Sequence, residues 1–153
     1  MNTVYYLDSS AWIKRYFEEP GSGWIINLFV SQDVLAASIF GYVEVAASLS
    51  RQTAQRHTIG QASMANVRNA FEAHWRNLLK IDVDHSMFQN AADLAWKTRL
   101  KGADAVHLAA ANTLRNNLAA RSISLVFITS DSELNTAALS LNLSVIDPAK
   151  ADG

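Results

Sequence analysis

Four acidic residues lie in surroundings that are otherwise apolar, and together they suggest one chemical site. Asp8 ends the apolar run TVYYL, and Asp131 follows the run SLVFITS. Glu44 lies inside the segment FGYVEVAASL, and Asp104 lies inside GADAVHLAAA. Burying an unpaired carboxylate in such surroundings costs free energy unless a cation, a hydrogen-bond network or a raised pKa compensates for it. The candidate site residues are therefore Asp8, Glu44, Asp104 and Asp131.

Clustered carboxylates are typical ligands of hard divalent cations such as Mg²⁺ or Mn²⁺, which prefer oxygen donors. The chain has no cysteine, so thiolate metal sites and disulfides are excluded. A divalent cation of this kind commonly acts on phosphates, because it lowers the pKa of a bound water and stabilises charge on the leaving oxygen. The four acids thus predict a metal-dependent site for phosphate chemistry, in which the cation offsets the repulsion between them.

Asp8 and Asp131 also have an ordinary structural explanation, since each precedes a helical pattern. An aspartate in this place can cap the helix, or stabilise its first turn through the helix dipole. The sequence SDSE at 130–133 is a capping box in its own right. Taken singly, these two residues fit helix capping at least as well as they fit a metal site.

Glu44 and Asp104 have alternative explanations of the same kind. Glu44 could pair with Arg51 two turns further along its helix, and Asp104 could cap a helix that begins after Gly102. His107, one turn beyond Asp104, is more typical of a packing histidine than of a metal ligand. Four acids would then need four separate explanations, whereas one shared site accounts for all of them.

The elements that must position these acids alternate along the chain. Strands are expected at 3–7, 34–38, 78–83, 124–130 and 143–147. Helices are expected at 9–17, 22–30, 39–54, 59–77, 85–99, 103–117 and 131–141. Strands that are apolar throughout and too far apart for hairpins favour a mainly parallel sheet covered on both faces. Ligands of such sheets bind beyond the carboxyl ends of the strands, where Asp8 and Asp131 should meet.

The chain has 153 residues, half of them hydrophobic, and we expect one domain over residues 1–153. It has no signal-like start and no run of about 18 apolar residues, which predicts a soluble protein that is neither exported nor inserted in a membrane. The lack of cysteine fits a reducing cytoplasm. Net charge is −1, but residues 51–121 carry ten Lys and Arg against five acids. This local excess could attract a polyanion.

The residues above resemble those of PIN-domain ribonucleases, and specifically the toxins of VapBC-type toxin–antitoxin pairs. YYLDSSAWIKRYFEEPGS is similar to the first motif of the family, YVEVAASLSR to the second, LKGADAVHLAAA to the third and FITSDSELNTAALSLNL to the fourth. No motif is specific alone, but their order, spacing and shared context make the combination specific over nearly the whole chain. In the last motif Asn142 replaces a small, glycine-like residue, and asparagine tolerates the left-handed conformation almost as glycine does.

The resemblance implies a three-layer α/β/α sandwich and an endoribonuclease, dependent on Mg²⁺ or Mn²⁺, that acts as the toxin of a type II toxin–antitoxin system. It also implies a cognate VapB-type antitoxin, an RNA substrate, a homodimer and a cytoplasmic location. Asp8, Glu44 and Asp104 would be the metal-binding and catalytic acids, and Asp131 would bind metal directly or through water.

Three rival functions are open to a chain of this kind. A haloacid-dehalogenase-type phosphotransferase needs a second acid two residues after the first, and Ser10 stands there. A Rossmann dinucleotide-binding protein needs a G-x-G-x-x-G motif after the first strand, which this chain lacks. The third rival is a catalytically inactive PIN-like module that binds RNA or protein. The intact set of acids argues against it without excluding it.

The surfaces for RNA and for a partner are less clearly marked. Basic residues that could flank a phosphate-binding groove are Arg56, Arg68, Arg76, Lys97, Arg99 and Lys101. The four tryptophans have apolar neighbours in the sequence, so we expect them to contact the core or a partner rather than to stack on RNA bases. They are Trp12, Trp24, Trp75 and Trp96. A groove for an antitoxin segment is expected after the first helix, formed by Trp24, Ile25 and Phe29.

Overall fold

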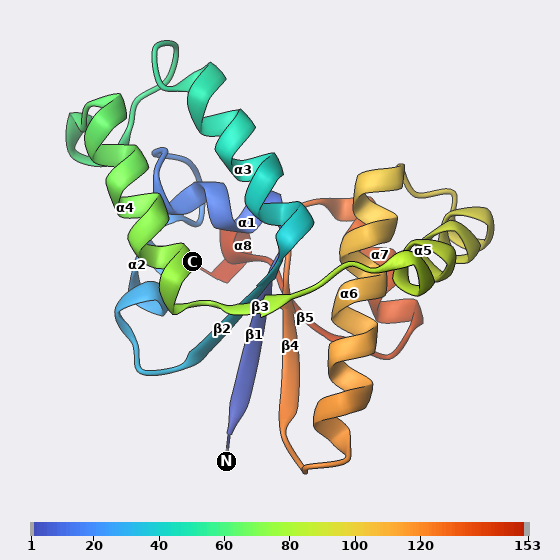
Figure 1. The fold of residues 1–153 in the computed structure, drawn as a ribbon. Coiled ribbons are helices and arrows are strands. Elements are labelled where there is room, and N and C mark those ends of the chain that lie inside the picture. Colours follow the sequence, from blue (N-terminus) through green and yellow to red (C-terminus); the bar gives the residue numbers. More distant parts are fainter. Residues whose placement is uncertain (1, 152–153) are drawn as a thin grey trace.

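The sheet at the centre of the protein has five strands, and all of its strand pairs are parallel. The computed structural model describes residues 2–151, and Figure 1 shows their course. The strands are β1 (Thr3–Leu7), β2 (Val34–Ser38), β3 (Leu79–Ile81), β4 (Ser124–Ile128) and β5 (Ser144–Ile146). Their order is β3-β2-β1-β4-β5, so β1 is the central strand. The predicted mainly parallel sheet is confirmed.

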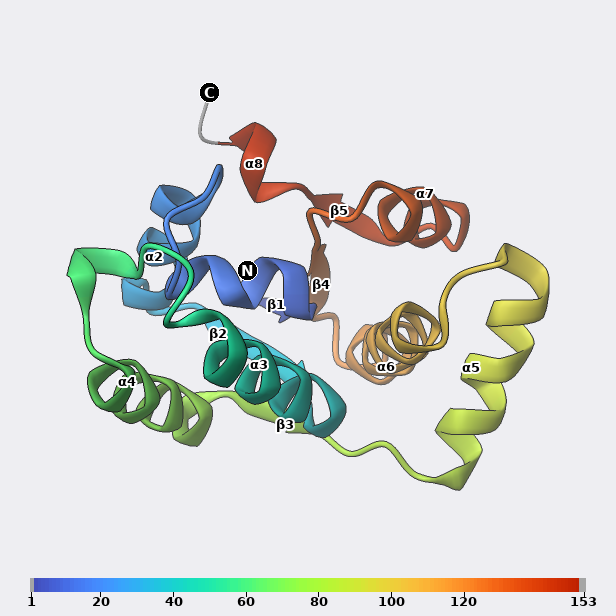
Figure 2. The ribbon, with the colours of Figure 1, turned by 90° about the horizontal axis from the view of Figure 1, so that it is seen from above.

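Helices cover both faces of this sheet, as Figure 2 shows from above. One side carries α1 (Ser9–Trp12), α2 (Ser22–Val30), α3 (Ile39–Gln52) and α4 (Met64–Asn77). The other side carries α5 (His85–Thr98), α6 (Gly102–Ala119) and α7 (Ser132–Ser140), while the short α8 (Pro148–Ala151) packs against α2. The arrangement is the predicted three-layer α/β/α sandwich. Within residues 2–151, no helix is both long and apolar enough to cross a membrane.

Alternate residues of the strands contribute to two apolar cores, one on each face of the sheet. Val4 and Tyr6 of β1 and Phe127 of β4 belong to the core beneath α5, α6 and α7. Leu7 and Ile128 belong to the core beneath α1 to α4. Successive side chains of a strand point to opposite faces, so a sheet covered on both sides needs apolar residues at every position. This explains why the strand segments show no polar alternation.

The helix expected at 59–77 begins later than the sequence pattern suggests. α4 starts at Met64, and Ser63 caps it by accepting a hydrogen bond from the backbone N–H of Asn66. Residues 59–61 form a separate 3₁₀ turn in which Gly60 has a φ of 65°. A left-handed residue cannot continue a right-handed helix, so the periodic pattern is interrupted there.

Other element ends also differ from expectation, and one of the differences forms part of the site. The strand expected at 124–130 ends at Ile128, which releases Thr129 and Ser130 from the sheet. The helix expected at 9–17 is α-helical only to Trp12, after which it continues as a 3₁₀ turn. Asn142 has a φ of 60°, so its predicted tolerance of the left-handed conformation is used between α7 and β5.

Candidate active site

Asp8 lies at the carboxyl end of the central strand, with only 2% of its surface exposed. One carboxylate oxygen accepts hydrogen bonds from the backbone N–H of Ala11 and the hydroxyl of Ser10, both at 2.8 Å. The other accepts a hydrogen bond of 2.5 Å from the hydroxyl of Thr129, just beyond β4. Asp8 therefore caps α1, as the capping explanation predicts, and is also fixed across the ends of β1 and β4.

The environment of Asp8 opposes its negative charge. Burial raises the pKa of Asp8, because the carboxylate loses its hydration. The charge of His107 and the hydrogen bonds from Thr129, Ala11 and Ser10 act in the opposite direction without reversing the shift. Because the pKa of Asp8 stays raised despite these donors, the protein compensates the negative charge of Asp8 only in part. A bound cation would compensate the remainder.

Glu44 lies on α3, with 29% of its side chain exposed, and two groups hold the same carboxylate oxygen. Ser9 donates to Oε1 at 2.6 Å, and His107 Nε2 lies 2.5 Å from it. Burial by itself raises the pKa of Glu44, but the hydrogen bond and charge of His107, together with Ser9, hold it below its ordinary value. The alternative pairing with Arg51 is wrong, because no ion pair joins these two residues within the described chain.

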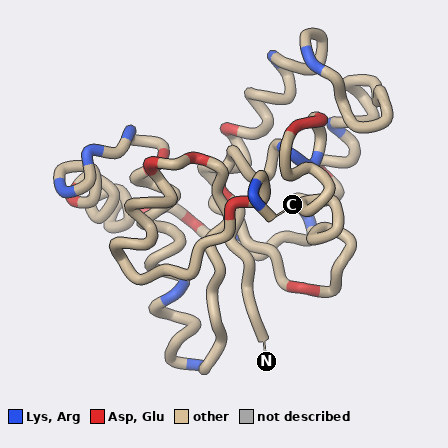
Figure 3. Tube along the Cα trace, turned by 180° about the vertical axis from the view of Figure 1, so that it is seen from behind, with Lys and Arg blue, Asp and Glu red and all other residues tan. Residues whose placement is uncertain are grey.

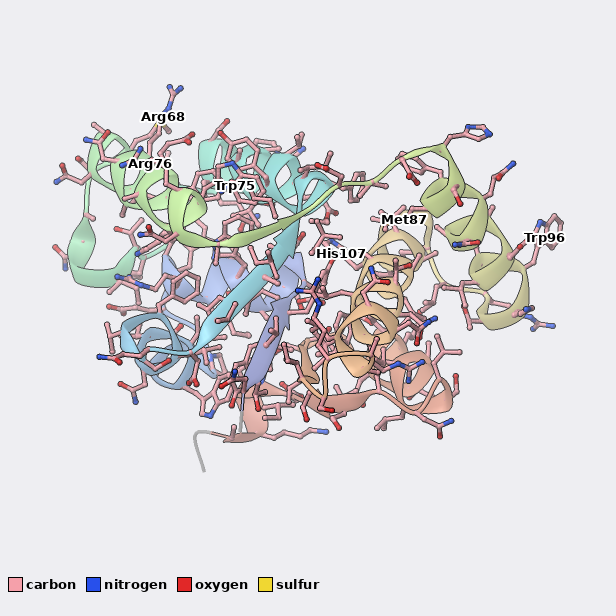
Figure 4. All side chains as sticks on the ribbon, turned by 60° about the horizontal axis from the view of Figure 1, so that its bottom comes forward. Arg68, Trp75, Arg76, Met87, Trp96 and His107 are labelled. Atoms are coloured by element: carbon pink, nitrogen blue, oxygen red, sulfur yellow. The ribbon has the colours of Figure 1, made fainter. Side chains whose placement is uncertain are left out.

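His107 connects Glu44 to the central strand. It projects from α6 between the two halves of the protein (Figure 4) and is 2% exposed. The hydroxyl of Tyr6 lies 3.0 Å from Nδ1, and Nε2 faces the carboxylate of Glu44. A Cβ atom at Gly41 would lie 3.0 Å from the ring, so this position of α3 favours glycine. His107 is a packing histidine, as expected, and it also contacts a site acid.

Asp104 lies in the first turn of α6 and does not cap that helix. The capping alternative is wrong, because the helix begins at Gly102 and its N-cap residue is Lys101. Burial raises the pKa of Asp104, and the negative charges of Asp131 and Asp8 raise it further. This repulsion indicates that the three aspartates share one region at the carboxyl edge of the sheet.

Asp131 has the capping role that its position suggests. Its carboxylate accepts a hydrogen bond of 2.8 Å from the backbone N–H of Leu134, and its own N–H donates to Thr129 Oγ1 at 3.1 Å. The capping box expected at 130–133 is wrong in register, because Asp131 itself is the N-cap residue. Thr129 thus links Asp131 to Asp8. Figure 3 shows acidic positions from separate parts of the chain near the middle of the molecule.

Two serines and a fifth acid join this network without having been predicted as site residues. The N–H of Ser130 donates to Ser10 Oγ at 3.1 Å, and the Ser130 hydroxyl donates to Asp147 at 2.9 Å. Asp147 directly follows β5. The signal that could have identified it is the one used for Asp8 and Asp131, an acid placed at the end of an apolar strand.

The basic residues expected to flank a groove separate into two groups. Arg56 forms an ion pair with Glu19 and lies over the ring of Phe17, so its charge is already engaged. Figure 4 shows Arg68 and Arg76 on α4, well away from His107. The positions of these residues therefore do not support the phosphate-binding groove predicted for the 56–76 segment. Lys97, Arg99 and Lys101 lie at the other side of the acids, where α5 leads into α6.

The expectations for apolar contacts are confirmed for some residues and wrong for others. Trp12 is fully buried, as predicted, but Trp96 is 87% exposed and points away from the protein (Figure 4). A core role for Trp96 is therefore wrong. Ile25 is fully buried, and Trp24 and Phe29 pack against the same core. Trp24 and Phe29 are only half-buried, so the antitoxin groove predicted from these three residues stays a prediction.

The donors of the site fit a hard divalent cation in chemistry, although their side chains are not gathered around one point. Asp8, Glu44, Asp104 and Asp131 offer carboxylate oxygens, which Mg²⁺ and Mn²⁺ prefer. Across residues 2–151, no three His, Asp or Glu side chains lie close enough together to hold a metal ion. The raised pKa values of Asp8 and Asp104 nevertheless indicate a region that favours added positive charge.

The fold and this acidic edge define an α/β protein whose candidate site lies beyond the carboxyl ends of its central strands. The model of the PIN domain family matches residues 5–139, and the chain belongs to this family. It is 33% identical over 106 residues to "Ribonuclease VapC45" and to "Ribonuclease VapC49", each from a strain of Mycobacterium tuberculosis. The match covers 69% of this chain and 73% of each relative.

Solved structures share the fold at much lower sequence identity. VapBC-1 from nontypeable Haemophilus influenzae is 14% identical with a TM-score of 0.59, covering 95% of this chain and 98% of that one. VapBC2 from Rickettsia felis, bound to a DNA fragment from its promoter, is 13% identical with a TM-score of 0.62, covering 94% and 97%. These likenesses confirm the PIN-like α/β fold predicted from the sequence.

Proposed function

We propose that this protein is a divalent-metal-dependent endoribonuclease that acts as the toxin of a type II toxin–antitoxin system. Membership of the PIN domain family and 33% identity to two proteins named as VapC ribonucleases support this proposal. The observation that carries it is the environment of Asp8, which is buried, has a raised pKa and is coupled by charge to Asp104. Buried like charges of this kind are typical of functional sites.

Asp8, Glu44, Asp104 and Asp131 would hold Mg²⁺ or Mn²⁺ in this proposal. The bound cation supplies a water of lowered pKa and neutralises charge on the phosphate. The chain's own contribution is orientation. Thr129 and Ser10 fix the carboxylate of Asp8, while Ser9 and His107 fix that of Glu44. Carboxylates held in this way lose little entropy when the cation and the RNA bind.

The proposed partners are an RNA substrate, a cognate antitoxin of the VapB type and a second copy of the chain, in the cytoplasm. The antitoxin is supported by the similar solved structures, which are described as VapBC pairs. The runner-up function is a PIN-like module that binds RNA or protein without cutting.

The test is cleavage of RNA by the purified protein. We expect internal cuts in Mg²⁺ or Mn²⁺ that leave 5′-phosphate and 3′-hydroxyl ends, because the attacking oxygen would come from water. Activity should vanish in chelator and fall by about 100-fold or more in Asp8→Asn and Asp104→Asn. Asp33→Asn is the matched control, since Asp33 is an exposed acid just before β2, away from the carboxyl ends of the strands.

Two results would contradict the proposal. Cleavage that persists in excess chelator, or that yields 2′,3′-cyclic phosphates, would exclude the metal-dependent mechanism. Tight RNA binding with no cleavage in either metal would favour the inactive module.

A further inference from the structure

Two grooves lined by both apolar and polar side chains open on either side of the acids. The first, here called the α3 groove, has a volume of about 320 Å³ and runs from Ser9 and Glu44 to Ser48 and Arg51. The second, called the α7 groove, has a volume of about 560 Å³. Arg99 belongs to one wall of it, at the end of α5. Each groove therefore combines hydroxyl groups with at least one cation.

The α3 groove leads directly away from the site. Glu44, Ser48 and Arg51 are spaced by four and then three residues, so they follow one face of α3. Ser9, at the near end, already donates to Glu44. Arg51 is exposed, and among the residues that the structure describes it forms no ion pair. Its charge is therefore available at the far end of the groove.

The α7 groove begins next to the acid on the opposite side. Ser132 follows Asp131 directly, and Thr136 lies one turn further along α7. Lys97 and Arg99 face these hydroxyl groups from the end of α5. Figure 3 shows Lys and Arg positions gathered where α5 leads into α6. Glu133 also lines this groove, so two cations face one acid there.

Arg99 occupies a backbone conformation that favours glycine. It is the C-cap residue of α5, with a φ of 61° and a ψ of 21°. Helices commonly end with glycine in this left-handed region because a Cβ atom is strained there. Strain of this kind often accompanies a functional requirement. Here it places an exposed guanidinium on the wall of the α7 groove, free of ion pairs within the described chain.

We propose that one RNA strand crosses the four acids with its backbone in both grooves, and that Arg51 and Arg99 bind phosphates on opposite sides of the scissile bond. The proposal rests on the function proposed above and assigns its substrate path. Arginine forks and hydroxyl groups are common phosphate-binding groups. They bind without reading base sequence, so these contacts position the strand for cleavage at the acids between them.

The test measures cleavage of a single-stranded RNA in Mg²⁺ by Arg51→Ala, Arg99→Gly and the double variant, over a series of salt concentrations. Each single change should raise KM about three- to tenfold with kcat unchanged, because the contacts lie away from the reacting bond. Each lost phosphate contact should also reduce the slope of log affinity against log salt by about 0.7, and the double variant by about 1.4. Fluorescence anisotropy in an Asp104→Asn background measures that slope without cleavage.

Arg121→Ala is the matched control, since it removes the same charge just beyond the end of α6, whose last residue, Ala119, lies about 22 Å along the helix from Asp104. Glycine suits the backbone at position 99, so Arg99→Gly should melt no lower than the wild type. If the wild type cleaves RNA and both variants keep its KM and salt slope, the path is wrong and the function stands. If only one variant changes, the two-sided path is wrong. Wild-type protein that neither binds nor cuts RNA would instead contradict the proposed function.

Discussion

At the scale of single residues, helix capping and membership of a charged site are compatible roles. Asp8 and Asp131 both accept the backbone hydrogen bond of a cap, and both act on the pKa of Asp104. A cap holds the carboxylate still, and a carboxylate of Asp has a second oxygen for another partner. The sequence leaves open whether Asp8 and Asp131 cap helices or bind a metal, and the fold is compatible with both roles at once.

His107 is expected to act as a positioning residue for Glu44. His107→Ala removes the group at 2.5 Å from Oε1 and should lower kcat by about tenfold or more. His107→Gln can place an amide N–H near the position of Nε2 and should recover part of that loss. Steady-state cleavage with thermal melts of both variants measures this. If the two variants are equally impaired at equal stability, the hydrogen bond to Glu44 has no special role.

The raised pKa of Asp104 gives the metal-free protein a pH dependence with a definite sign. Its pKa is raised above 3.8 by burial, Asp131 and Asp8, so the folded state binds the proton more tightly than the unfolded state. The stabilisation of the folded state by this proton is fully present below the pKa that Asp104 has in the unfolded state. It is lost as the pH rises through the higher pKa of the folded state. In chelator, wild type should therefore lose stability relative to Asp104→Asn as the pH rises above about 4. Urea unfolding of both proteins across this range measures the difference, and a constant difference would contradict the shift.

At the scale of elements, local pattern predicts where strands and helices lie better than where they end. β1 and β2 have the predicted bounds because short apolar runs bounded by polar residues leave little choice. The helix expected from residue 59 fails because the left-handed Gly60 is not visible in a periodic pattern. The contacts of Tyr6 with His107 and of Ser9 with Glu44 join residues far apart in sequence. No local pattern contains them, so the sequence could suggest the candidate acids but not the residues that hold them.

The end of α5 supplies a prediction at this scale. Arg99→Gly should raise the free energy of unfolding by up to about 1 kcal/mol, because glycine adopts a φ of 61° without strain. Asn142→Gly is the matched control, with a φ of 60° but a residue that already tolerates it. Its gain should be no more than a few tenths of a kcal/mol. Urea unfolding of the three proteins gives the comparison, and a destabilised Arg99→Gly would mean that the side chain supports the fold.

At the scale of the whole molecule, the site is the place where the two halves of the sandwich meet. Asp8 comes from the central strand, Glu44 from a helix on one face, and Asp104 from a helix on the other. No single half contains the set, so its geometry depends on how both cores pack against β1. This arrangement concentrates negative charge at one edge, and that charge opposes folding until a cation or a partner compensates it.

Metal binding should therefore appear as a change in global stability whose sign depends on the cation. In chelator, Glu44→Gln should melt below the wild type, because it removes a carboxylate that His107 and Ser9 stabilise. Asp8→Asn, Asp104→Asn and Asp131→Asn should melt at or above the wild type, because each removes one of several repelling charges. In millimolar Mn²⁺ the three aspartate variants should also melt below the wild type. A ligand that binds only the folded state stabilises it by RT ln(1 + [L]/Kd), about 2.7 kcal/mol at 100 times Kd, and the substituted sites bind it more weakly. Asp33→Asn should follow the wild type in both conditions. If Mn²⁺ leaves the wild-type melting temperature unchanged, or raises it equally in all six proteins, the four acids do not share a cation and the endoribonuclease proposal loses its chemical basis.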